Sequence, residues 1–136
     1  MFANHINYSA VLIAAIVAWI FSAVWYRAFL ARWLDAVGKT REQLLPEGRR
    51  SLHIMAISFL AQLLMAGVVA YFIPVMGRVS VLAGLLTAGL CWLGFVLTSI
   101  VVNNGYTRDR PALAVVASWH WLGVLLVMGA VIGAFG

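Results

Sequence analysis

The stretch that decides the fold is ALAVVASWHWLGVLLVMGAVIGAF, which occupies residues 112–135 and follows Pro111. It contains no Asp, Glu, Lys or Arg. A helix needs about 20 consecutive apolar residues to cross the hydrocarbon core of a bilayer. Proline is well tolerated in the first turn of a helix. The stretch therefore predicts a transmembrane helix over residues 112–135.

Three further apolar segments have the same character, at residues 6–26, 52–73 and 79–102. Their apolar residues are continuous rather than alternating, which favours helices over the strands of a barrel. The composition agrees, because 65% of the 136 residues are hydrophobic and 10% are charged. Soluble domains carry about 25% charged residues. We predict an all-α polytopic membrane protein, a single domain over residues 1–136 in which four transmembrane helices form an antiparallel bundle.

The positions of Lys and Arg predict how the chain is threaded through the membrane. One basic residue, Arg78, lies between the second and third spans. Eight lie in the other two connections, and these are Arg27, Arg32, Lys39, Arg41, Arg49, Arg50, Arg108 and Arg110. Basic connections stay in the cytoplasm. We therefore expect a multi-pass protein of the bacterial inner membrane with both termini in the periplasm.

The connection over residues 27–51 is then cytoplasmic, and its first part predicts a short amphipathic helix at the lipid surface. The net charge of +5 follows from this topology. No basic stripe with interleaved aromatic residues lies outside the spans, so we expect no nucleic-acid partner.

Small residues recur at helical spacing in the spans, and such residues let transmembrane helices approach closely. The candidate packing residues are Ala14, Ala18, Ser22, Gly84, Ala88, Gly129 and Gly133. The third span carries two faces of this kind, which predicts a spare face for a homodimer through the third or fourth span. The expected partners are the lipid bilayer and, as open alternatives, a second copy of the chain or another membrane protein.

His120 stands between Trp119 and Trp121, inside the fourth span. At 1.5 Å per residue it lies about 12 Å from the cytoplasmic edge. Side chains of comparable depth complete a candidate polar cluster, which comprises His120, Gln62, Ser58, Ser118 and Thr98. Two interpretations are open, hydrogen bonding between helices and a small polar pocket between the second, third and fourth spans. Two residues along a helix are about 200° apart, so at least one tryptophan should face lipid or a second subunit.

A charged imidazole inside the membrane is costly without a carboxylate partner, and none of the four spans contains Asp or Glu. We therefore expect His120 to be a neutral hydrogen-bonding group. The sequence contains no nucleophile–base pair, phosphate loop or metal cluster, so we expect no enzyme, no catalytic residue, no metal site and no cofactor.

A second candidate site is an aromatic and basic rim at the cytoplasmic surface, formed by Trp25, Tyr26, Arg27, Asn103, Arg108 and Arg110. Interfacial anchoring and attraction to anionic lipids explain such a rim. Binding of a phosphorylated or carboxylate ligand is the alternative.

Several segments together resemble a known family. They are INYSAVLIAAIVAWIFSAVWY at 6–26, WLGFVLTSIVVNN at 92–104, Arg110–Pro111, and WLGVLLVMGAV at 121–131. The chain resembles the small four-helix bacterial membrane proteins of domain-of-unknown-function family 1761. The resemblance implies the architecture but no activity, substrate or cofactor. In that family an aromatic residue often stands where this chain has His120, which argues against a catalytic role shared by the family.

The sequence thus predicts a small inner-membrane protein with an interaction, accessory or membrane-structural role. The alternative is a small channel or transporter that acts as a homo-oligomer. Proton-coupled exporters of similar size depend on a glutamate in the membrane, and its absence from the spans weighs against that alternative.

Overall fold

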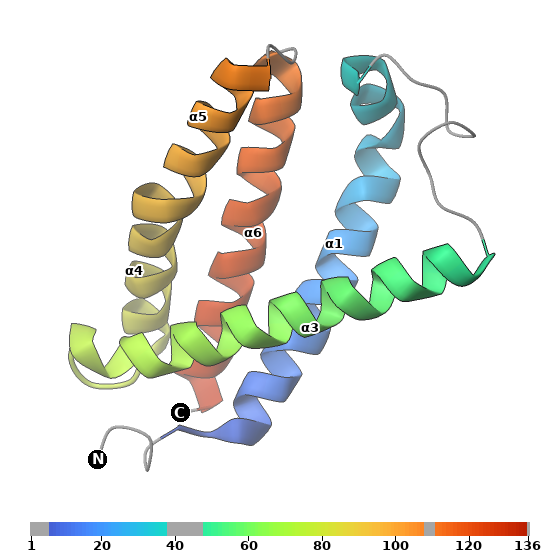
Figure 1. Ribbon diagram of the computed structural model, residues 1–136. Coiled ribbons are helices and arrows are strands. Elements are labelled where there is room, and N and C mark those ends of the chain that lie inside the picture. The colour runs from blue at the N-terminus through green and yellow to red at the C-terminus, as the bar shows by residue number, and fades with distance from the viewer. Residues whose placement is uncertain (1–5, 38–47, 108–110, 136) are drawn as a thin grey trace.

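The computed structural model describes residues 6–37, 48–107 and 111–135, and all regular structure within these ranges is helical. Figure 1 shows the main helices, which are α1 (Tyr8–Val37), α3 (Gly48–Phe72), α4 (Val81–Cys91), α5 (Thr98–Thr107) and α6 (Pro111–Phe135). A 3-10 segment, η2 (Ile73–Met76), follows α3, and a π-helical segment, η3 (Trp92–Leu97), joins α4 to α5.

Four helical stretches are long and apolar enough to cross a membrane, namely Tyr8–Phe29, Ser51–Met76, Val81–Tyr106 and Ala114–Phe135. They coincide with the four predicted spans. The prediction of an all-α, multi-pass membrane protein is confirmed.

Helix α6 lies between α1 and α4 and runs antiparallel to both (Figure 1). Asn7 connects α1 to α6, because its Nδ2 donates a hydrogen bond to the carbonyl of Phe135 at 3.3 Å. The Oδ1 of Asn7 accepts from the amide of Ala10 at 3.1 Å, which is the usual way to cap the first turn of a helix. The start of α1 and the end of α6 therefore lie at the same end of the molecule.

Helix α3 departs from the alignment of a regular bundle, because it crosses the other helices at a steep angle (Figure 1). It packs mainly against α1. Two helices that cross steeply touch over a short stretch and diverge on either side of it. The divergence leaves gaps between α3 and α1, and the candidate site lies in one of them.

A tight turn connects α3 to α4. Pro74 cannot continue a regular helix because it lacks an amide hydrogen, and the chain narrows to the 3-10 segment η2 at this point. Gly77 has a φ of 120°, a conformation that other residues rarely adopt. The side chain of Ser80 then caps α4 by accepting a hydrogen bond from the amide of Ala83 at 3.1 Å.

Glycines bring α4 and α6 into backbone contact. A Cβ atom on Gly84 would overlap the carbonyl of Gly129, and a Cβ on Gly133 would overlap the carbonyl of Ser80. Ala88 is fully buried in the same contact. These candidate packing residues are therefore used within one chain, and the spare face expected for a homodimer does not lie on them.

Three helix boundaries differ from the predicted ones. Helix α1 does not end near Tyr26 but continues to Val37, so the amphipathic segment extends the first span. Helix α3 begins at Gly48, four residues before the predicted span. Helix α5 continues through Asn103 to Thr107, because Asn and Gly cost at most about 1 kcal/mol each inside a helix. Residues 38–47 of the predicted cytoplasmic loop lie outside the described part of the chain.

Candidate functional site

Two buried polar side chains, Gln62 and His120, meet at the buried hydroxyl of Ser22, and the three residues come from three helices. The Nε2 of Gln62, on α3, donates a hydrogen bond to Ser22 Oγ at 3.0 Å. The Nε2 of His120, on α6, lies 2.9 Å from the same Oγ. The exposed fractions of Ser22, Gln62 and His120 are 8%, 1% and 2%, so lipid does not reach them. We call these three residues the polar triad.

Aromatic rings enclose the imidazole of the triad. Its centroid lies 4.6 Å from that of Tyr26 and 4.8 Å from that of Trp121. The Phe21 ring is stacked with it at 6.4 Å, and Phe21 occupies the space that a Cβ on Gly123 would need. The imidazole thus sits in an apolar surrounding whose polar contact is Ser22.

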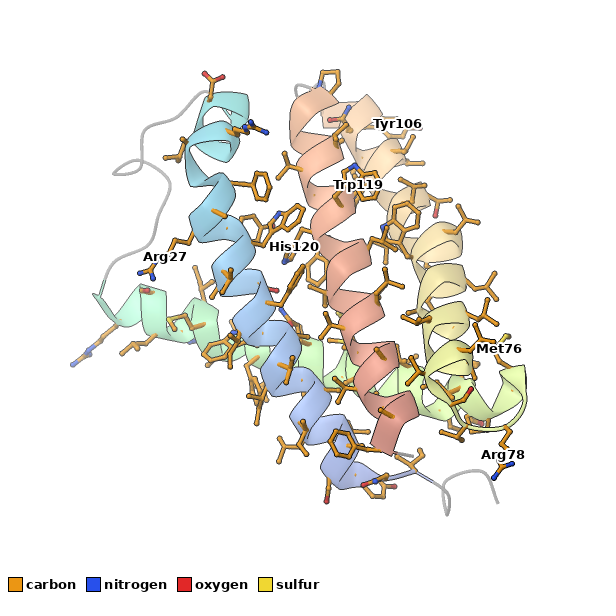
Figure 2. All side chains as sticks on the ribbon, turned by 180° about the vertical axis from the view of Figure 1, so that it is seen from behind. Arg27, Met76, Arg78, Tyr106, Trp119 and His120 are labelled. Atoms are coloured by element: carbon orange, nitrogen blue, oxygen red, sulfur yellow. The ribbon has the colours of Figure 1, made fainter. Side chains whose placement is uncertain are left out.

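The two tryptophans that flank His120 lie in different surroundings. Trp119 is 58% exposed on the outer surface, whereas Trp121 is half-buried beside His120. Figure 2 shows Trp119 and His120 on different sides of α6, with His120 between α6 and α1. The prediction that at least one tryptophan faces away from the histidine is confirmed.

A pocket of 390 Å³ opens beside the triad, between α1, α3 and α6. The triad forms part of its wall together with Ser58 and a set of apolar and aromatic side chains, which are Trp19, Ala23, Tyr26, Ile54, Met55 and Trp121. None of the lining residues carries a formal charge. Pockets that bind small molecules have volumes of about 300–1,000 Å³ and combine apolar walls with a few polar groups, and this one fits that description.

Buried polar atoms near the pocket lack hydrogen-bond partners. Oε1 of Gln62, Nδ1 of His120 and Nε1 of Trp25 are all buried and unpaired. A buried polar atom without a partner costs about 1–3 kcal/mol. The polar triad therefore retains hydrogen-bonding capacity that a bound molecule could use, and Gln62 and His120 both line the pocket.

A second cavity lies between α1 and α3, near the other end of α1. It has a volume of 630 Å³ and is walled by apolar residues and the rings of Tyr8 and Tyr71. Although it is larger, no unpaired buried polar atom lines it. The chemical features that select a ligand are thus concentrated beside the triad.

The structure places the five residues of the predicted polar cluster in different surroundings. His120 and Gln62 meet at Ser22, and Ser58 lines the same pocket. Ser118 is buried, and its carbonyl accepts a hydrogen bond from Trp92 Nε1 at 2.8 Å. Thr98 is exposed and bonds to the carbonyl of Gly94 in its own helix. The pocket therefore lies between the first, second and fourth spans, and the third span does not line it.

The described members of the predicted rim do not meet at one place. Trp25 and Tyr26 pack around His120 inside the protein, with Trp25 at 6.3 Å from the imidazole. Arg27 is exposed on α1, and Asn103 is exposed on α5, on the far side of α6 (Figure 1). Arg108 and Arg110 lie outside the described residues.

Within the described residues, no group of three or more His, Cys, Asp or Glu side chains comes close enough to hold a metal ion. His53 is exposed near the start of α3.

Sequence reasoning assigned Ser22 to helix packing and missed its place at the centre of the triad. It is the one hydroxyl in the small-residue stripe that begins at Ala10 and continues through Ala14 and Ala18. A polar group in a stripe that faces other helices is the signal that could have identified it.

A family model described as "Protein of unknown function (DUF1761)" matches residues 9–133, which is nearly the whole chain. No curated protein and no solved structure matches the chain.

Proposed function

Since the chain belongs to the DUF1761 family, whose description assigns no activity, we propose a function from the geometry of its own pocket. The protein binds an uncharged, lipophilic small molecule between α1, α3 and α6, in an interaction or accessory role rather than as an enzyme. The observation that carries this proposal is Gln62, a residue of the pocket lining that is 1% exposed and whose buried Oε1 has no hydrogen-bond partner.

The lining of the pocket favours an uncharged ligand. The aromatic rings of Trp19, Tyr26 and Trp121 could attract a cation, but cation–π contacts contribute about 0.5–2 kcal/mol. Removing a charge from water costs several kcal/mol, and no carboxylate lines the pocket to offset that cost. An anion would face the same cost without a basic residue in the lining. A neutral molecule avoids both costs.

The position of the pocket favours a lipophilic ligand that enters from the bilayer. Its walls are mostly apolar, and Ile54 and Met55 are 43% and 46% exposed on the outer surface of α3. A ligand that places a small polar group against the triad could leave its apolar part in contact with lipid. The bilayer itself would then supply the ligand.

Native mass spectrometry of protein purified from membranes in a mild detergent tests this proposal. We expect the wild-type protein to retain a lipophilic molecule that organic extraction releases. Ala23→Phe should lose it, because Ala23 lines the pocket without belonging to the triad and a phenyl ring there would fill the space. Ala61→Phe is the matched control, since Ala61 is exposed on α3 and lines neither the 390 Å³ pocket nor the 630 Å³ cavity.

If the wild type, Ala23→Phe and Ala61→Phe carry the same molecules in the same amounts, the proposal is wrong. Equal retention would mean that the molecules adhere to the outer surface of the helices. Movement of the bound molecule across liposome membranes, if it depends on Ala23 in the same way, would identify the protein as a transporter.

A further inference from the structure

We infer that the polar end of the ligand is a hydroxyl group, so that the pocket takes a lipophilic alcohol or phenol. The inference rests on the proposed binding function and adds the chemical class of the ligand. It follows from the hydrogen-bond capacity of the polar triad.

The triad forms a chain of hydrogen bonds that runs from Gln62 through Ser22 to His120. A serine hydroxyl has one hydrogen to donate and two lone pairs that accept. When Gln62 Nε2 donates to Ser22 Oγ, the hydroxyl hydrogen of Ser22 is free to be donated to His120 Nε2. His120 then carries its proton on Nδ1. In this direction the Gln62 end of the chain presents the acceptor Oε1 and the second N–H of Nε2, and the His120 end presents a donor.

The same three side chains also support the opposite direction. A neutral histidine has two tautomers, and a glutamine amide that turns over exchanges its oxygen and nitrogen. His120 Nε2 then donates to Ser22, and Ser22 donates to the amide oxygen. The Gln62 end of the chain now presents both of its N–H donors, while its oxygen accepts from Ser22. No charge appears in either direction, as the apolar surrounding requires.

A ligand that fits the triad in both directions must both donate and accept hydrogen bonds through a small group. A ketone or an ether only accepts, and an ammonium only donates. A primary amide does both, but it has two donor hydrogens and an acceptor oxygen to satisfy. Besides the triad, the polar groups of the lining residues are the hydroxyls of Ser58 and Tyr26 and the indole N–H groups of Trp19 and Trp121. A hydroxyl matches the chain in either direction by rotation about one bond.

A series of probes that share one tail tests the inference. We propose 4-bromododecanol, its methyl ether and 4-bromododecyl-trimethylammonium, which carry the bromine near the polar end, each titrated into phosphatidylcholine nanodiscs that contain the protein. The bromine quenches tryptophan fluorescence, and Trp19 and Trp121 line the pocket. The specific signal is the quenching in the wild type minus that in Ala23→Phe.

In the wild type, the alcohol should reach half-saturation at a mole fraction about tenfold lower than the ether, because a buried acceptor such as Gln62 Oε1 gains a donor. Gln62→Met should remove the difference between the alcohol and the ether, because the acceptor that distinguishes them is lost. Circular dichroism would check that Gln62→Met is folded. If it is not, the comparison of the alcohol with the ether in the wild type still tests the hydroxyl assignment.

Equal binding of the alcohol and the ether in the wild type, or tighter binding of the ammonium, would overturn the hydroxyl assignment while the binding function stands. The absence of a quenching difference between the wild type and Ala23→Phe for all three probes would overturn the binding function itself. The two failures are therefore distinguishable.

Discussion

Ser22 joins three helices through one hydroxyl, and His120 depends on it for its hydrogen bond. Hydrogen bonds between transmembrane helices contribute about 0.6 kcal/mol on average. The triad is therefore a weak contribution to stability, and its importance lies in the polar atoms that it holds at the wall of an apolar pocket. The aromatic rings around His120 account for most of the packing at this position.

Because the hydrogen bond of His120 contributes little and its aromatic packing contributes more, two substitutions of His120 should have opposite outcomes. His120→Phe keeps a ring of similar size and loses one hydrogen bond, so thermal unfolding in detergent should shift by a few degrees or less. His120→Asp buries a carboxylate without a basic residue in the pocket lining, a change that costs several kcal/mol. We expect this variant to unfold or aggregate on size-exclusion chromatography.

His53→Asp is the matched control, because His53 is exposed near the start of α3 and a carboxylate there should be tolerated. Metal and haem analysis of the same samples completes the test. Stoichiometric metal or haem that disappears in His120→Phe would show that His120 is a ligand rather than a neutral hydrogen-bonding group.

At the scale of the helices, the close contact between α4 and α6 depends on glycines, which have no Cβ atom. Gly84→Ala would place a Cβ on the carbonyl of Gly129 and force the helices apart. Overpacking of this kind typically costs about 1–3 kcal/mol, so the midpoint of thermal unfolding should fall by several degrees. Gly89→Ala on the same helix meets no atom within 4 Å and should leave the midpoint unchanged or slightly raised. Equal midpoints for the two variants would contradict the close contact.

The oligomeric state of the same two variants is informative. The glycine contact lies within one chain, so Gly84→Ala should lower stability at every protein concentration without a shift from dimer to monomer. A homodimer remains a proposal, and it would have to use another face. Dissociation of a wild-type dimer by Gly84→Ala would show instead that this glycine face joins two copies.

The four spans could be predicted from the sequence because apolar length is a local property. That His120 and Gln62 lie at a common level was also predictable, since each residue adds a fixed rise along its helix, and both side chains reach Ser22. Which helices face one another is not local. The pocket is lined by the first span rather than by the third, and the partner of His120 is Ser22, which the predicted cluster did not include.

The ends of the helices show the same limit. Asn103 and Gly105 favour a helix stop, yet α5 continues to Thr107. Local preferences of about 1 kcal/mol are smaller than the gain from continuing the hydrogen bonds of a helix that is already formed. The continuation of α1 to Val37 follows the same reasoning.

For the molecule as a whole, the hydrogen bond between Asn7 and Phe135 places the start of α1 and the end of α6 on one side, as Figure 1 shows. We propose that this side is the periplasm, because eight of the nine Lys and Arg residues lie in the two connections at the opposite end. Alkaline phosphatase, which is active only in the periplasm, should be active when fused after Gly136 and inactive when fused after Glu47. Green fluorescent protein at the same positions should give the complementary pattern. The reversed pattern would invert the topology.

The central claim is that the pocket beside Ser22, Gln62 and His120 receives a lipophilic molecule, and a crystal structure with 4-bromododecanol tests it most directly. Anomalous scattering locates the bromine, and the electron density locates the hydroxyl. We expect the hydroxyl within hydrogen-bonding distance of the Gln62 amide, with the tail leaving between α1 and α3 toward lipid. Bromine only in the 630 Å³ cavity near Tyr8 and Tyr71, or a 390 Å³ pocket filled by a second copy of the chain, would contradict the claim.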